Sequence, residues 1–173
     1  VKSVDIELLR NNHLESKHEV FITSDKDQDD FEFFPRSAIK PFQIIPLLFL
    51  AKEKQISFGS EEIAIFGSSH SGQDIHVNLL TNIAKKYNIN SNDIFCAPQR
   101  PMHVDTADQY ILNKLPFTKL NNNCSGKHLS MLIYSKLLNI ESDNYYKVNH
   151  TVQENINKFF KDIFELSDIK YAI

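Results

Sequence analysis

The spacing of apolar and polar positions predicts two kinds of element, strands at the start of the chain and helices after them. Apolar and polar residues alternate over Val4–Leu8, Val20–Thr23 and Phe31–Phe33, which is the period of a half-buried strand. The acidic stretch 24–30 between the last two is typical of a turn. We therefore predict a strand followed by a hairpin before residue 35.

From Ser37 onward the periodicity is helical. A first helix should start near Ser37, where Pro41 fits the first turn but Pro46 demands a kink or a break. Further helices are predicted from Ser60 to Gly67, over Asp74–Tyr87, from a cap at Thr106 through Leu112, over Lys127–Leu138 and over Thr151–Phe164. Because two or three strands do not easily make a stable sheet face, either helices cover both faces or further strands come from elsewhere.

Composition narrows the class of protein. The 173 residues suffice for one domain with a core, and 42% hydrophobic with 24% charged residues fits a soluble globular protein. A net charge of −3 with scattered basic residues predicts no nucleic-acid partner. The longest apolar run, Ile44–Ala51, is too short for a membrane span, and no secretory signal opens the chain. Two cysteines, Cys96 and Cys124, suit a reducing cytoplasm.

Three polar clusters stand outside the helical periodicity. They are Arg36-Ser37-x-x-Lys40, Gly67–Gly72 and Asn121–His128. Three of the four glycines lie in the last two clusters, where the backbone must turn sharply or approach another group closely. Small polar residues at helix starts also leave N–H groups free to bind a carboxylate or an oxyanion.

The first cluster has the residue types of a serine nucleophile and its base. A serine followed three residues later by a lysine places a hydroxyl and an amine on one face of a helical turn, and Ser37 and Lys40 have this spacing. The pattern recurs at Ser167-x-x-Lys170, so a helix cap with a solvated lysine stays open as an alternative. An ordinary capped loop and a buried thiol before a helix start are the corresponding alternatives for the other two clusters.

Taken together, the clusters resemble the rhizobial-type asparaginases, the asparaginase II-like family. The matching segments, which extend from about residue 15 to the end, are Glu15–His18, Pro35–Gln43, Ser68–Gly72, His76-Val77 and Asn122–His128, with weaker matches at Cys96, Pro101, Tyr145, His150 and Gln153. The resemblance implies an α/β (α+β) fold like that of the serine β-lactamases, with N-terminal strands and a largely helical region. It also implies hydrolysis of L-asparagine to L-aspartate and ammonia.

The resemblance assigns roles to the reactive residues. It implies Ser37 as the nucleophile, Lys40 as its activating partner and Ser69 as the hydroxyl of a second Ser/Lys pair. Cys124 and Lys127 would be ligands of a zinc ion near the substrate, and Lys127 would then have to bind as a neutral amine. The metal would orient the substrate or strengthen the field of the pocket rather than supply the nucleophile.

The same resemblance implies a pocket and a longer protein. Arg36, His70, Asn122 and Asn123 would line or support the substrate site. The family's chains are about twice as long as this one, so we interpret residues 1–173 as a single truncated domain that lacks the C-terminal sheet strands. An Asp-Gly-Cys segment with the third zinc-ligating cysteine, and the lysine partner of the second serine, would lie beyond Ile173. His18-Glu19-Val20 also departs from the family, which follows its histidine with Arg-Gly.

The predicted function is that of an L-asparaginase-type amidohydrolase in the cytoplasm, with L-asparagine as its small-molecule substrate. A second copy of the chain or a complementing C-terminal fragment is the expected protein partner, with no nucleic acid and no membrane. The alternative is a catalytically inactive truncated remnant or an interaction module of the same fold. A penicillin-recognising acyl-enzyme is a third interpretation, against which the missing Lys-Thr-Gly weighs.

Overall fold

The computed structural model describes residues 2–10, 13–22, 35–166 and 169, and the chain divides into two compact units. The first unit is Val1–Phe34 and the second is Pro35–Ile173. All three polar clusters belong to the second unit.

The first unit contains one antiparallel pair of strands. β1 (Lys2–Arg10) pairs with β2 (His13–Ile22) in a two-stranded sheet, with an irregularity in register after Leu8. A two-stranded hairpin by itself is at best marginally stable in water. The strand predicted over Phe31–Phe33 lies outside the described residues.

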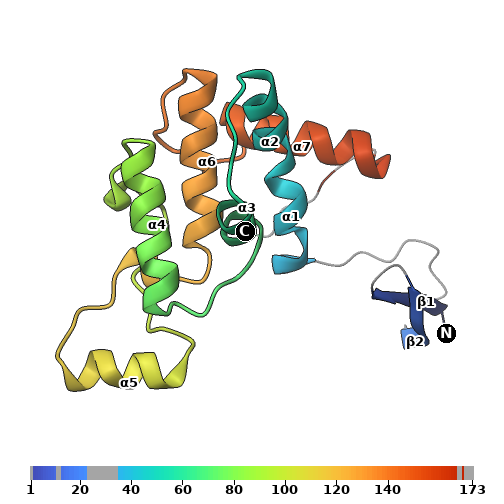
Figure 1. Ribbon diagram of the computed structural model, residues 1–173. Coiled ribbons are helices and arrows are strands. Elements are labelled where there is room, and N and C mark those ends of the chain that lie inside the picture. Colours follow the sequence, from blue (N-terminus) through green and yellow to red (C-terminus); the bar gives the residue numbers. More distant parts are fainter. Residues whose placement is uncertain (1, 11–12, 23–34, 167–168, 170–173) are drawn as a thin grey trace. The chain divides into compact units, whose positions relative to one another are not determined.

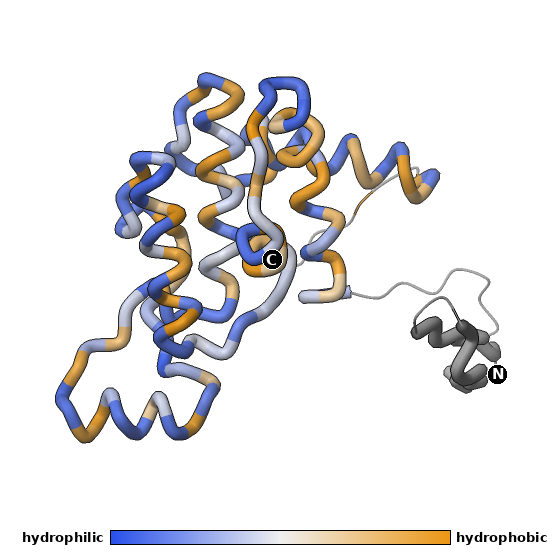
Figure 2. The backbone as a smooth tube through the Cα atoms, viewed as in Figure 1, coloured by the Kyte–Doolittle hydropathy of each residue, from blue (hydrophilic) through white to orange (hydrophobic). Residues whose placement is uncertain are grey.

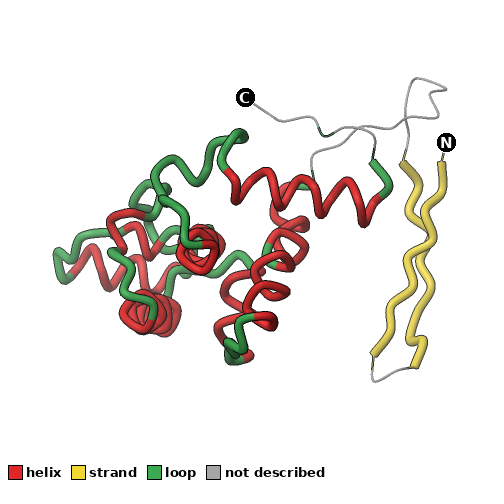
Figure 3. Tube along the Cα trace, turned by 90° about the horizontal axis from the view of Figure 1, so that it is seen from above, coloured by secondary structure: helices red, strands yellow, loops and turns green. Residues whose placement is uncertain are grey.

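The predicted α/β (α+β) fold like that of the serine β-lactamases is wrong, because the two N-terminal strands that the structure describes form a pair of their own. Every regular element described from Pro35 onward is helical, as Figure 3 shows, and the described strands pair only with each other in a separate unit. The prediction failed because alternation is confined to the start of the chain, whereas the long segments that follow carry helical spacing and helix caps. The functional clusters therefore lie on a helical scaffold.

The first helical segment is interrupted just before Pro46, the second of its two prolines. A 3₁₀ turn η1 (Arg36–Ile39) leads into a short helix α1 (Lys40–Gln43), and α2 (Ile45–Glu53) starts anew one residue later. Pro41 and Pro46 each occupy the first turn of their own helix, where a missing N–H costs nothing. The predicted break at Pro46 is confirmed.

The later helices follow the predicted periodicity closely. They are α3 (Ser60–Gly67), α4 (Asp74–Lys86), α5 (Val104–Leu112), α6 (Ser125–Leu138) and α7 (Thr151–Phe164), with 3₁₀ turns η2 (Ser91–Asp93) and η3 (Lys119–Asn121). The bounds of α3 and α7 match the prediction, α4 ends one residue early and α6 starts two residues early. In the stretches that the structure describes, every helix is too short or too polar to span a lipid bilayer.

Histidines cap two of these helices. Thr106 was predicted to cap α5, but His103 holds that position and its Nδ1 accepts a hydrogen bond from the Thr106 N–H at 3.3 Å. His150 caps α7 in the same way and accepts from the Val152 N–H at 3.2 Å. Because the usual capping residues are Ser, Thr, Asp and Asn, the sequence pattern did not indicate these imidazole caps.

Helix α6 forms the centre of the core and contacts α2, α3, α4 and α7 (Figure 1). Buried apolar side chains from these five helices meet there: Leu47, Phe66, Leu80, Leu129, Ile133, Val152 and Ile156. Each such side chain contributes about 1.5–3 kcal/mol when it leaves water. The polar first turn of α6 is therefore held in place by a well-packed helix.

Gly126 sets how closely α6 approaches α3. A Cβ at this position would lie 2.0 Å from the backbone carbonyl oxygen of Ile65. Only glycine allows this close approach, because any side chain would have to displace a backbone atom. The start of α6 is thereby fixed against the end of α3, from which the second polar cluster continues.

Helix α5 lies apart from the other helices at one end of the unit (Figure 1), and apolar and polar residues alternate along its trace (Figure 2). Val104, Ile111 and Leu112 are 63%, 54% and 80% exposed, whereas Thr106 and Ala107 are buried. Helix α5 therefore buries only a narrow strip of its surface.

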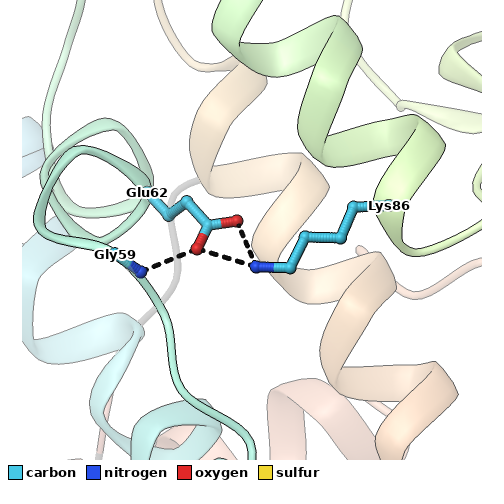
Figure 4. A network of polar contacts seen from close by, with 3 residues as sticks. All are labelled: Gly59, Glu62 and Lys86. Carbon is cyan, nitrogen blue, oxygen red and sulfur yellow. Dashed lines mark hydrogen bonds and ion pairs between the residues drawn. The ribbon is translucent and has the colours of Figure 1, made fainter.

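A surface network joins α3 to α4 (Figure 4). The Glu62 carboxylate accepts a hydrogen bond from the Gly59 N–H at 2.7 Å, and Gly59 is the N-cap of α3. The same carboxylate pairs with Lys86 Nζ at 2.9 Å. The hydrogen bond between Lys86 and Glu62 is the main cause of the raised pKa of Lys86. The network caps α3 and ties it to the last turn of α4.

Candidate active site

The three polar clusters meet at the side chain of Lys40, which is 4% exposed. Lys40 Nζ donates to Ser69 Oγ at 2.7 Å and lies 3.4 Å from the Ser68 carbonyl oxygen. It also lies 3.4 Å from the Asn123 carbonyl oxygen and 3.3 Å from Cys124 Sγ. One buried amine therefore joins residues that lie 28 to 84 positions away in the chain.

The hydroxyl of Ser69 lies between Lys40 and Ser37. Ser69 Oγ is 3.0 Å from Ser37 Oγ, and both serines are exposed to solvent. The shortest hydrogen bond that the structure records for the Lys40 amine goes to Ser69, although Ser37 is closer in sequence. The turn over Arg36–Ile39 is a 3₁₀ helix, and the link from amine to Ser37 runs through a second hydroxyl.

Arg36 enters this turn in a left-handed backbone conformation. Its φ is +48°, which few residues other than glycine adopt and which costs of order 1–3 kcal/mol. The side chain of Arg36 is exposed, next to the exposed Ser37. Backbone strain beside a reactive residue is common in active sites, because surrounding contacts hold the residue in place.

The two predicted asparagines form hydrogen bonds within the loop before α6 and from this loop to other segments. Asn122 Oδ1 accepts from the Cys124 N–H at 2.9 Å, and Asn122 Nδ2 donates to the Ala97 carbonyl at 3.0 Å. Asn123 takes part through its carbonyl oxygen, which lies near Lys40 Nζ and 3.4 Å from the His70 N–H. Both asparagines therefore shape the loop before α6.

Cys124 and Lys127 have donor chemistry that suits a soft divalent metal. A zinc-bound lysine must be neutral, and burial lowers the pKa of Lys127, with a further lowering from Lys40 and an opposing effect of Cys124. A cysteine binds zinc as the thiolate. Among residues that the structure describes, no group of three His, Cys, Asp or Glu side chains gathers around a metal position. The two predicted ligands fit zinc in kind and supply only part of a usual set.

The roles of several further residues were not predicted from the sequence. His128 Nδ1 lies 2.8 Å from the Tyr145 hydroxyl, which accepts from the Phe95 N–H at 2.7 Å. Burial is the main cause that lowers the pKa of His128 to about 4. Ser125 and Asn121, which are also buried, bond to the loop that carries Ser69. In the sequence, Asn121, Ser125 and His128 were marked only by their place in the third cluster, which did not indicate their hydrogen-bond partners.

Comparison with protein families identifies the family to which the chain belongs. The sequence profile of the L-asparaginase II family matches residues 6–173, which is nearly the whole chain. The chain belongs to the L-asparaginase II family, and its general class is that of the L-asparaginase-like amidohydrolases. The resemblance inferred from the motifs is thereby confirmed. Comparison with curated proteins finds no match.

Proposed function

We propose that this chain hydrolyses the side-chain amide of L-asparagine, with Ser37 as nucleophile and Lys40 as base. The observation that carries the proposal is the hydrogen-bonded series from Lys40 Nζ through Ser69 Oγ to Ser37 Oγ, with distances of 2.7 and 3.0 Å. Family membership supports asparagine as the small-molecule substrate. Exposure of both serines beside a buried amine supports access of substrate to the nucleophile.

In the first half-reaction, Ser37 Oγ attacks the amide carbon. Its proton passes to Ser69 Oγ while the Ser69 proton passes to Lys40 Nζ, which must start as the neutral amine. The tetrahedral intermediate collapses, the C–N bond breaks, and the departing nitrogen takes back the proton through the same two groups. Ammonia leaves, and a β-aspartyl ester remains on Ser37.

In the second half-reaction, water attacks the ester carbonyl. The same amine and hydroxyl accept the proton of the water, the bond to Ser37 Oγ breaks, and that oxygen regains a proton. Asparagine and water are thus converted to aspartate and ammonia with the chain restored. The recorded partners of Lys40 Nζ are a hydroxyl, two carbonyl oxygens and the sulfur of Cys124, and the hydroxyl is the one that leads to Ser37.

No step of the proposed reaction depends on zinc, and only the residues that would bind it are assigned. Cys124 and Lys127 would hold the ion, which would orient substrate and strengthen the local field when bound. Burial favours the neutral Lys127 amine that such a bond needs.

The test follows ammonia release from L-asparagine by the purified chain and by matched serine variants. Ser37→Ala and Ser69→Ala should each lower kcat at least about 10³-fold. The nucleophile and the hydroxyl that relays its proton act as one unit, so removal of either stops the proposed reaction. Ser57→Ala removes an exposed serine hydroxyl elsewhere in the helical unit and should leave kcat unchanged. Robust turnover by Ser37→Ala would contradict the assignment of Ser37 as the nucleophile. A folded wild-type chain that releases no ammonia would favour the inactive-module alternative.

A further inference from the structure

His70 lies next to Ser69 but faces the interior, with 5% of its surface exposed. Both of its ring nitrogens have protein partners. Nδ1 accepts from the Gly72 N–H at 3.1 Å, so the proton of the neutral ring belongs on Nε2. Nε2 in turn lies 2.9 Å from Ser125 Oγ. The hydrogen-bond network thus assigns a single tautomer, in which Nε2–H donates to Ser125.

Ser125 continues the network in the same direction. It is the first residue of α6, fully buried, and its Oγ donates to the Leu120 carbonyl oxygen at 3.2 Å. Each donor in the series therefore meets one acceptor, from the Gly72 N–H through the imidazole and the hydroxyl to the carbonyl. A satisfied buried network of this kind fixes one arrangement, since losing any member leaves a polar group unpaired.

Other contacts join the same two segments, 68–72 and 120–125. Asn121 Nδ2 donates to the Gly72 carbonyl at 3.2 Å, and the His70 N–H lies 3.4 Å from the Asn123 carbonyl oxygen. Gly72 has φ +76°, and a Cβ there would lie 2.6 Å from the Asn121 carbonyl oxygen. The two segments are therefore held together over several residues.

Each partner of the imidazole–hydroxyl pair is adjacent in sequence to a group that contacts Lys40. Ser69 precedes His70, and Cys124 precedes Ser125. We propose that His70 and Ser125 form a buried clasp that positions Ser69 on Lys40, so that both are positioning residues of the hydrolytic site. This inference rests on the proposed function. Of the two predicted roles for His70, lining or supporting the substrate site, it assigns the supporting one, because both ring nitrogens have protein partners.

The first test compares two buried serines of the same helix. Ser125→Ala removes the clasp hydroxyl, whereas Ser135→Ala removes an equally buried hydroxyl that donates only within α6, to the Met131 carbonyl at 3.2 Å. Ser125→Ala should lower kcat for L-asparagine about 10–100-fold with KM within about twofold of wild type, because small misplacements of a reacting group cost this much. Ser135→Ala should keep the wild-type kcat. Equal losses of kcat in Ser125→Ala and Ser135→Ala would contradict the proposed clasp.

A second pair of variants separates the two ring nitrogens. The amide of His70→Gln can place an N–H near the Nε2 position, whereas His70→Asn reaches only the Nδ1 position. We expect His70→Gln to retain most of kcat and His70→Asn to fall to the level of Ser125→Ala. Combining His70→Asn with Ser125→Ala should cost no more than either change alone, since both remove one interaction. Additive losses, or Asn performing as well as Gln, would contradict the inference.

Crystal structures of wild type and Ser125→Ala separate this inference from the proposed function. The variant should show Ser69 Oγ beyond hydrogen-bond distance, about 3.5 Å, from Lys40 Nζ. If Ser69 stays in place, the clasp does not position it, whatever the turnover. If Ser69 moves while the wild-type chain fails to hydrolyse asparagine, the proposed function is wrong and the positioning role stands.

Discussion

Lys40 and Lys86 use the same functional group in opposite environments. Lys86 is 48% exposed and pairs with the carboxylate of Glu62, in the network of Figure 4. Lys40 is 4% exposed and its recorded partners are three oxygens and the sulfur of Cys124. The Lys86–Glu62 pair gains little because water screens its half-exposed lysine, whereas the buried Lys40 amine depends on every partner it has. The comparison thus sets a lysine that joins two helices against the lysine of the proposed hydrolytic site.

The largest effect in this comparison should come from Lys40→Met. Methionine keeps most of the apolar length of the side chain and removes the amine, so the base of the proposed reaction is lost. We expect kcat for L-asparagine to fall at least about 10³-fold, the usual cost of removing a member of a catalytic unit. Ammonia release measures it, with Lys86→Met as the matched control at wild-type kcat. Comparable losses in both variants would show that the buried position has no special role.

The convergence on Lys40 was predictable only in part. The motifs identified Ser37, Lys40 and Ser69, and in the structure Ser69 is hydrogen-bonded to each of the other two. The order of contact was not predictable, because the Lys40–Ser69 bond joins residues 29 positions apart and depends on how α3 meets α1. The burial of His70 was likewise hidden, since its partner Ser125 lies 55 positions away.

Local periodicity predicted helices better than it predicted the fold. α7 is strongly amphipathic and carries its own boundaries, so Thr151–Phe164 could be read from the sequence. The fold class failed because strand alternation near the start says nothing about which elements pack on a sheet. The close approach of Gly126 to Ile65 is a tertiary contact that only coordinates reveal.

A second, smaller effect concerns the pH dependence of stability through His70. Burial, with smaller contributions from the stacked His76 and from Lys40, lowers the pKa of His70 to about 4, against 6.5 in an unfolded chain. Between these values the unfolded chain binds a proton that the folded chain does not. The free energy of unfolding should therefore be highest above pH 6.5 and should fall as pH drops toward 4.

His70→Gln provides the control for this titration, because glutamine keeps a donor for Ser125 but does not ionise. Urea unfolding between pH 7.5 and 4 should show a shallower pH dependence for the variant than for wild type. Any slope common to both curves belongs to other groups. Parallel curves over the whole range would mean that the ring of His70 does not titrate between pH 6.5 and 4 on folding.

The smallest effect should come from the surface pair itself. Lys86→Met removes the cation that joins α4 to α3 but leaves the Glu62 carboxylate bonded to the Gly59 N–H. Because Lys86 is half exposed, we expect the free energy of unfolding to fall by less than about 1 kcal/mol, and the difference from wild type to shrink further in 1 M salt. Chemical unfolding at low and high salt measures it. A loss of several kcal/mol that salt leaves unchanged would place this pair with the buried contacts and remove the contrast between the two lysines.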